Sequence, residues 1–191
     1  IVTFDTLTEE FGGGAGETTT VVIDGTMTPE AHNALVAAQQ ELAGVADVQV
    51  FGENAQATSP VTVLAQVLAS LQPADQAAPS AGLATTVDPA LAQQIAGMLE
   101  PGGLTVPADT DVEALYDLLL QAAPDVAGQV IAAQDDVVRV SVSTAAGEER
   151  AVALGENLDA VFAPVEAELG GDSVVVTSDG IISSRIVTSL R

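Results

Sequence analysis

The chain has 191 residues, no cysteine, and 27 acidic residues against only 4 lysines and arginines, which gives a formal net charge of −23. Without cysteine, disulfides, thiolate zinc sites, iron–sulfur clusters and a cysteine nucleophile are excluded. The negative charge argues against nucleic-acid binding and against docking to anionic membranes, while 48% hydrophobic residues are enough to build a core.

The basic residues are all arginines: Arg139, Arg150, Arg185 and Arg191. Carboxylates in place of lysine, and small residues in place of large aromatics, are typical of proteins from extreme halophiles. In molar salt the Debye length falls to about 3 Å, so repulsion between like charges is screened. We therefore attribute most of the acidity to habitat, with an acidic face for a cation or a basic partner as the alternative.

The first predicted unit is β-α-β. A β-branched run at 18–24 predicts a strand, and Thr28-Pro29-Glu30 carries three helix-start signals, an N-cap, an N1 proline and an acidic first turn. That helix should stop at Gly44. The alternating segment 45–51 then predicts a second strand, with Val48 and Val50 on one face.

A second unit of the same kind closes the chain. Strands are predicted at 137–143 and 173–177, with an apolar helical stripe from Leu154 to Leu169 between them. Pro164 inside this stripe should kink or split the helix near Ala163. The order predicts an α+β fold, the ferredoxin-like split βαβ sandwich, with both helices on one face of a four-stranded sheet.

Residues 52–134, between the two units, are predicted to be a helical insertion within a single domain, 1–191. Ser59-Pro60 and Asp88-Pro89 repeat the N-cap and proline signal, and a third helix should begin near Asp109 with Thr110 and Glu113 as a capping box. Pro124 should interrupt this third helix before a further helical stretch at 126–133. The apolar stripes of the inserted helices could either pack in the core or contact a substrate; they include Leu64, Val67, Leu91, Ile95 and Leu115.

Glycines and the single histidine offer little chemistry. The run 12–16 (GGGAG) could cradle a phosphate, but a strand follows it and no Lys-Ser or Lys-Thr ending is present, so a linker is favoured. His32, the only histidine, lies near the start of a helix beside Asn33 and is predicted to be a surface or cap residue rather than a catalyst.

The acidic motifs are also explained without chemistry. Asp109, Asp111 and Glu113 have calcium-loop spacing, but Ala114 replaces the turn glycine, so a capped helix start is favoured. Asp135-Asp136 and Glu148-Glu149-Arg150 are interpreted as solvated turns. Carboxylates alone do not indicate a glycosidase, because there is no Trp and only Tyr116 to form a sugar platform. We therefore predict no enzyme activity, no catalytic, cofactor or metal-binding residues and no cofactor, and leave the substrate-contacting residues unassigned.

The chain resembles the extracytoplasmic porter domain of resistance-nodulation-division (RND) transporters. The resemblance is carried by five segments, in this order around a helical stretch: TTTVVIDG, TPE, VADVQVF, VVRVSVST and SVVVTSDGIISSRIVTSL. The MMPL-like predicted exporters of archaea and actinobacteria are the most similar branch. The most specific parts are 11–25 and 174–190, where the family has a strand, a short turn and a helix that enters a membrane span. The beginning at Ile1 and the apolar stretch before Arg191 lead us to expect a piece of a longer protein.

The resemblance implies an extracytoplasmic domain of a multi-pass membrane protein, from a halophilic archaeon, that captures and passes apolar or lipid-like substrates. Its partners would be the flanking transmembrane helices, with a homo-oligomer left open and no nucleic acid. The proton-relay residues of such transporters lie outside this segment. Two alternatives remain: a self-standing ferredoxin-like module that binds a small ligand or a protein, and a hydrolase or metal-dependent enzyme that depends on a carboxylate such as Asp135.

Overall fold

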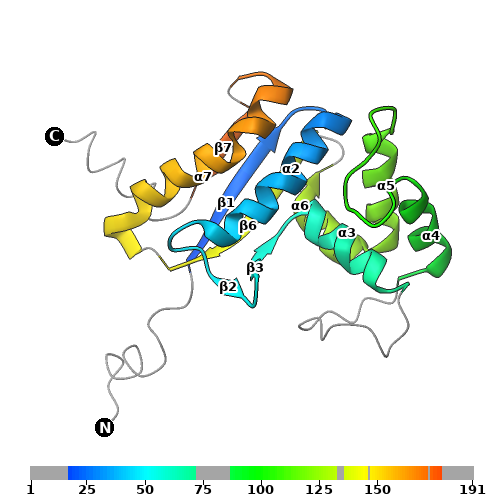
Figure 1. Cartoon of the computed structure of the whole chain (residues 1–191), viewed down its shortest axis with the longest axis horizontal. Helices are drawn as coiled ribbons and strands as arrows, with labels where there is room; N and C mark the ends of the chain where they lie inside the picture. Colours follow the sequence, from blue (N-terminus) through cyan, green and yellow to red (C-terminus); the bar gives the residue numbers. More distant parts are fainter. Residues whose placement is uncertain (1–16, 72–86, 133–135, 146, 172, 178–191) are drawn as a thin grey trace, which may run out of the picture.

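The computed structural model describes residues 17–71, 87–132, 136–145, 147–171 and 173–177. Within these ranges the fold is mixed α/β, with an antiparallel sheet and helices packed against one of its faces (Figure 1). Strands β1 (Glu17–Asp24), β6 (Val137–Thr144) and β7 (Val174–Thr177) confirm the three strands predicted at 18–24, 137–143 and 173–177.

The sheet has the spatial order β4-β6-β1-β7, in which β4 (Ala57–Thr58) lies at one edge and β5 (Ile131–Ala132) also pairs with β6. Central strands β1 and β6 pair along their full lengths, from Glu17 opposite Thr144 to Asp24 opposite Val137. One face is apolar and buried because side chains alternate along each strand. This face carries Val21, Ile23, Val138, Val140, Val142 and Val176.

Two long helices cover the apolar face. Helix α2 (Pro29–Glu41) begins at Thr28, whose hydroxyl accepts a hydrogen bond from the Ala31 amide, as the N-cap signal predicts. Helix α7 (Gly147–Leu169) lies beside α2 in Figure 1 and packs along it. The sequence predicts a kink or a split near Ala163, and the split is wrong: α7 runs through Pro164 without interruption. Proline removes one amide donor, and the long apolar stripe packed below holds the helix together around it.

The strand predicted at 45–51 is wrong in most of its length. Helix α2 ends at Glu41 and a short 3-10 turn, η1 (Leu42–Gly44), follows. Val48 makes an isolated bridge to Thr144, and the chain then turns back on itself as β2 (Val50–Phe51) and β3 (Asn54–Ala55). Val48 is buried and Val50 is exposed, because the hairpin leaves the sheet and β4 takes the edge position.

The described residues between β4 and β6 include four helices: α3 (Pro60–Ala69), α4 (Pro89–Gly97), α5 (Val112–Ala122) and α6 (Pro124–Val130). Their positions agree with the helices predicted within 52–134, although α6 ends at Val130 and the next two residues form β5 instead of continuing the helix. Helices α3 and α4 open at the predicted caps, Ser59 and Asp88. Helix α5 begins at Val112, and its N-cap is Asp111, whose carboxylate accepts from the Ala114 amide. The predicted capping box of Thr110 and Glu113 is therefore wrong.

The inserted helices share one hydrophobic core with the sheet and its two long helices. Leu64, Val67, Ile95 and Leu115 are fully buried, and Leu91 packs partly buried against them. Core packing, the first of the two roles considered for these stripes, is therefore the one observed. A substrate would have to contact other side chains.

Candidate functional site

The loop that follows α4 forms part of the wall of the candidate site, and α2 holds this loop in place. After α4, Pro101 and Gly102 form a tight turn in which the Gly103 amide donates to the Glu100 carbonyl at 3.1 Å. Gly102 has φ +78, a left-handed backbone that the third residue of such a turn requires and that glycine adopts without strain. The turn brings Leu104 and Val106 back toward α2.

His32 fixes Leu104. The Nε2 atom of His32 lies 3.0 Å from the Leu104 carbonyl oxygen, and its Nδ1 atom lies 3.0 Å from the Tyr116 hydroxyl. A carbonyl can only accept, so Nε2 carries the proton and donates, and Nδ1 accepts from the hydroxyl of Tyr116. The neutral imidazole thus satisfies both of its nitrogens between α2, α5 and the loop.

Burial keeps both rings uncharged. His32 is fully buried, and loss of solvation lowers the pKa of its imidazole, although the hydrogen bond to Leu104 acts in the opposite direction. Burial likewise raises the pKa of the Tyr116 hydroxyl, which stays protonated and able to donate. The rings also meet edge to face, with centroids 5.8 Å apart. The prediction of His32 as a surface or cap residue is therefore wrong.

Asn33 holds the next part of the same loop. Its side-chain amide donates to the Val106 carbonyl at 2.9 Å, and its side-chain oxygen accepts from the Val106 amide at 2.8 Å. The Asn33 side chain therefore pairs with both backbone groups of Val106, as the backbone of a neighbouring β-strand would. Adjacent residues of α2, His32 and Asn33, therefore position the loop from Leu104 to Val106.

Two hollows line α3, and they share Ala65 and Leu104 as walls. One, of about 380 Å³, lies where α2, β3 and α3 meet; its other walls include Val36, Gln39, Gln40, Asn54, Val61 and Thr62. The second, of about 390 Å³, lies where α3, α4 and the Pro101 turn meet; its other walls include Leu68, Ala69, Ala96, Leu99, Pro101 and Gly103. We call the two together the α3 groove.

The groove carries almost no charge in a chain of net charge −23. Among its lining residues Glu100 is the single ionised side chain, at the α4 end, where its carboxylate accepts from the Thr105 hydroxyl at 3.0 Å. Amides from Gln39, Gln40 and Asn54 line the end near α2, and small or apolar side chains line the other. This polarity suits an uncharged ligand with an apolar part and a hydrogen-bonding part.

A third, smaller cavity of about 60 Å³ lies beneath Tyr116, and Glu113, Asp117 and Asp136 are among its walls. Within the described part of the chain, no group of three or more His, Asp or Glu side chains has the placement needed to hold a metal ion. Its size suits a few water molecules. The cavity is smaller than either hollow of the α3 groove, and three carboxylates are among its walls, whereas the groove has one.

The remaining motif residues lie apart from the groove. Asp109, Asp111 and Glu113 are exposed at the start of α5. Asp136 is exposed with φ +50, and its backbone carbonyl accepts from the Gly25 amide. Arg150, in the first turn of α7, forms an ion pair with Asp47.

Several sequence motifs fall outside the described residues. They are the glycine run 12–16, the carboxylate Asp135, the segment 178–190 that contributes to the family resemblance, and the side chains of Glu148 and Glu149.

Comparisons with models of known families, with curated proteins and with solved structures found no match to this chain. No helix in the described ranges combines the length and the apolar character needed to cross a bilayer.

Proposed function

We propose that this chain is the extracytoplasmic domain of a membrane transporter resembling the RND superfamily, most similar to its MMPL-like exporters. In this proposal it captures an apolar or amphiphilic substrate in the α3 groove and performs no chemistry itself. The observation that carries the proposal is the α3 groove, whose two hollows of about 380 and 390 Å³ share Ala65 and Leu104 as walls and include one carboxylate, Glu100, on a chain with net charge −23.

The strand order supports this proposal. The main path of the sheet contains β1, β4, β6 and β7, which are the first to fourth strands of that path in chain order. Across the sheet they lie in the order β4, β6, β1, β7, so the second strand comes first and is followed by the third, the first and the fourth. With α2 and α7 together on one face, this order agrees with the ferredoxin-like split βαβ arrangement that we propose for the fold. The helices α3 to α6 then correspond to an insertion between its two halves. A self-standing module of the same fold that binds a small ligand or a protein is the alternative.

Substrate binding is testable with a fluorescent amphiphile. We expect N-phenyl-1-naphthylamine to increase in fluorescence on binding the protein in molar KCl, and Ala96→Phe to weaken binding at least tenfold. Ala96 lines the half of the groove next to α4, and a ring there would occupy the space needed by the ligand.

The matched control is Ala160→Phe, which adds the same ring at an exposed position on α7, away from the groove. This variant should bind like the wild type. Equal binding by the Ala96→Phe variant, or no fluorescence change with the wild type, would contradict ligand capture in the groove.

The transporter context has its own test, which is to read about 40 codons of the gene on either side of this segment. Apolar stretches of about 20 residues on both sides would support a domain tethered between membrane spans. Start and stop codons next to the segment would instead favour the self-standing module, whatever the result of the binding experiment.

A further inference from the structure

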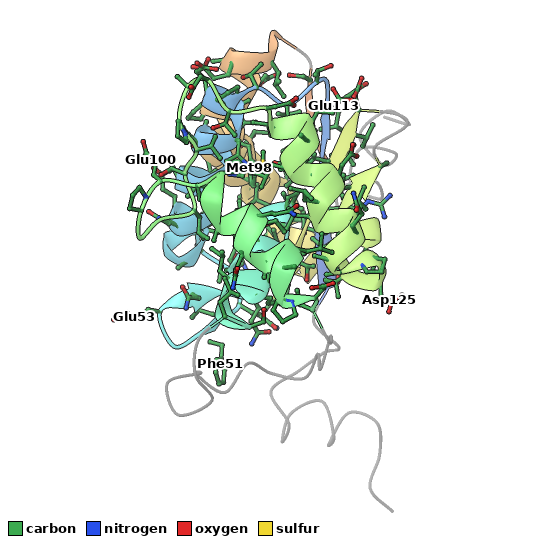
Figure 2. The ribbon with its side chains drawn as sticks, turned by 90° about the vertical axis from the view of Figure 1, so that its right-hand side faces the viewer. Phe51, Glu53, Met98, Glu100, Glu113 and Asp125 are labelled. Atoms are coloured by element: carbon green, nitrogen blue, oxygen red, sulfur yellow. The ribbon has the colours of Figure 1, made fainter. Side chains whose placement is uncertain are left out.

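The β2–β3 hairpin presents an aromatic side chain to solvent. Phe51 is 74% exposed, whereas Phe162 and Tyr116 are almost fully buried. The reversal at Gly52, which has φ +66, places Phe51 at the tip opposite Asn54. Figure 2 shows Phe51 pointing away from the body of the protein. An exposed ring held on a short hairpin has the form of an interface anchor.

An uncharged hollow, lined by both apolar and amide side chains, lies directly beside this hairpin. Asn54, the cross-strand partner of Phe51, and Ala55 both line the half of the α3 groove between α2 and α3. That half has a volume of about 380 Å³, and every residue lining it is uncharged. Phe51 is not among these residues, so its ring leaves the hollow of its own chain open.

An anchor and a hollow side by side form a self-complementary patch. A two-fold dimer uses the same surface on both copies, so an anchor of each must meet the hollow of the other. Two copies of a chain with net charge −23 repel each other, and they can approach most closely where carboxylates are absent. Glu53 is the carboxylate of the hairpin turn, and Figure 2 shows it on a different side of the hairpin from Phe51.

We propose that two copies of this chain pair through the hairpin and the α2–α3 face, with each Phe51 ring seated in the groove half of its partner between α2 and α3. The partner thereby contributes a wall to the site, while the half next to α4 stays open. The pairing occupies half of the groove in which we propose ligand capture, so a captured ligand is confined to the half next to α4. The experiments below test the pairing without any ligand.

Cross-linking between two single variants tests the contact, because the chain has no cysteine of its own. Phe51→Cys protein is mixed with Gln40→Cys protein in molar KCl with oxidised glutathione as the oxidant. The Gln40→Cys copy keeps its own Phe51, so one of the two anchors of the mixed pair stays in place, whereas Phe51→Ser below removes both. Gln40 is exposed and lines the hollow. We expect the 51–40 cross-linked dimer to form at least tenfold faster than the dimer from Val175→Cys and Gln40→Cys, where Val175 is a 53% exposed residue on β7.

Sedimentation velocity in the same buffer measures the pairing without a cross-link. We expect dimers for the wild type and for Val175→Ser, and monomers for Phe51→Ser. A wild type that stays monomeric at 100 µM, a Phe51→Ser variant that stays dimeric, or equal cross-linking rates for positions 51 and 175 would each overturn the proposal. Because Phe51 is exposed, its replacement removes no core contact, so loss of the dimer would not reflect unfolding.

Discussion

His32 shows how one side chain can connect three distant parts of the fold. Its hydrogen-bond partners, Tyr116 and Leu104, lie 84 and 72 positions away in sequence. Its buried imidazole needs one donor and one acceptor, and α5 and the loop after α4 supply one each. No local pattern encodes partners at such distances, so the sequence could place His32 on α2 but could not predict its burial.

The protonation of His32 leads to a prediction about pH. An imidazolium at this position would have two N–H donors, and Nδ1 would meet the hydroxyl of Tyr116 that now donates to it. Since burial lowers the pKa in the folded state, the unfolded chain binds the proton more readily between that pKa and about 6.5. The free energy of unfolding should therefore fall as the pH drops below about 6.5, by at most about 1.4 kcal/mol per pH unit.

The chain contains a single histidine, so one imidazole resonance in an NMR titration reports on it directly. We expect its midpoint below 6.5. The stability change is measured as the difference between the wild type and His32→Gln, because the carboxylates are common to both and cancel. A midpoint at or above 6.5, or denaturation curves whose difference does not change with pH, would contradict the assignment of a buried neutral imidazole.

At the scale of elements, local signals predicted helices well and strands unevenly. Caps followed by proline act within one turn, so the starts after Thr28, Ser59 and Asp88 could be predicted from the sequence. The segment 45–51 alternates like a strand, but whether it joins the sheet depends on which segment pairs with β6. The strand β4 pairs there, and only tertiary structure decides this.

The same caps provide a matched test of local stabilisation. Ser59 is fully buried: its hydroxyl accepts from the Thr62 amide and donates to Gln39, and Thr62 completes a capping box. Asp88 caps the Ala90 amide from an exposed position. We expect Ser59→Ala to lower the free energy of unfolding by about 2 kcal/mol and Asp88→Ala by about 0.5 kcal/mol. Water can take the place of the exposed Asp88 carboxylate as a hydrogen-bond partner, but it cannot take the place of the buried Ser59 hydroxyl.

Urea denaturation at constant molar KCl measures both values. The order matters more than the magnitudes, since both variants remove one cap from a proline-initiated helix. Equal losses, or a larger loss for Asp88→Ala, would mean that burial of the α3 cap adds nothing to its contribution.

The whole molecule separates an uncharged interior from an acidic surface. Buried polar side chains in the described ranges are Thr19, His32, Ser59, Thr144 and Ser173, with no carboxylate among them. The carboxylates that are described lie on the surface, where Asp47 pairs with Arg150 and cations are few. The core thus explains why the chain folds, and the acidic surface leads us to expect that the stability of the fold depends on salt.

Salt should decide whether this fold is stable. At about 0.1 M salt the Debye length is about 10 Å, so surface carboxylates on neighbouring helices repel each other, whereas at 1 M it is about 3 Å and the repulsion is screened. We expect the helical circular-dichroism signal to be lost when KCl is lowered from 2 M to 0.1 M and to return when KCl is restored. Betaine, an uncharged osmolyte, serves as the control because it favours compact states without screening charge. Recovery in KCl but not in equimolar betaine would identify screening as the cause. A circular-dichroism signal that stays unchanged from 2 M to 0.1 M KCl would contradict the interpretation of the acidity as adaptation to salt.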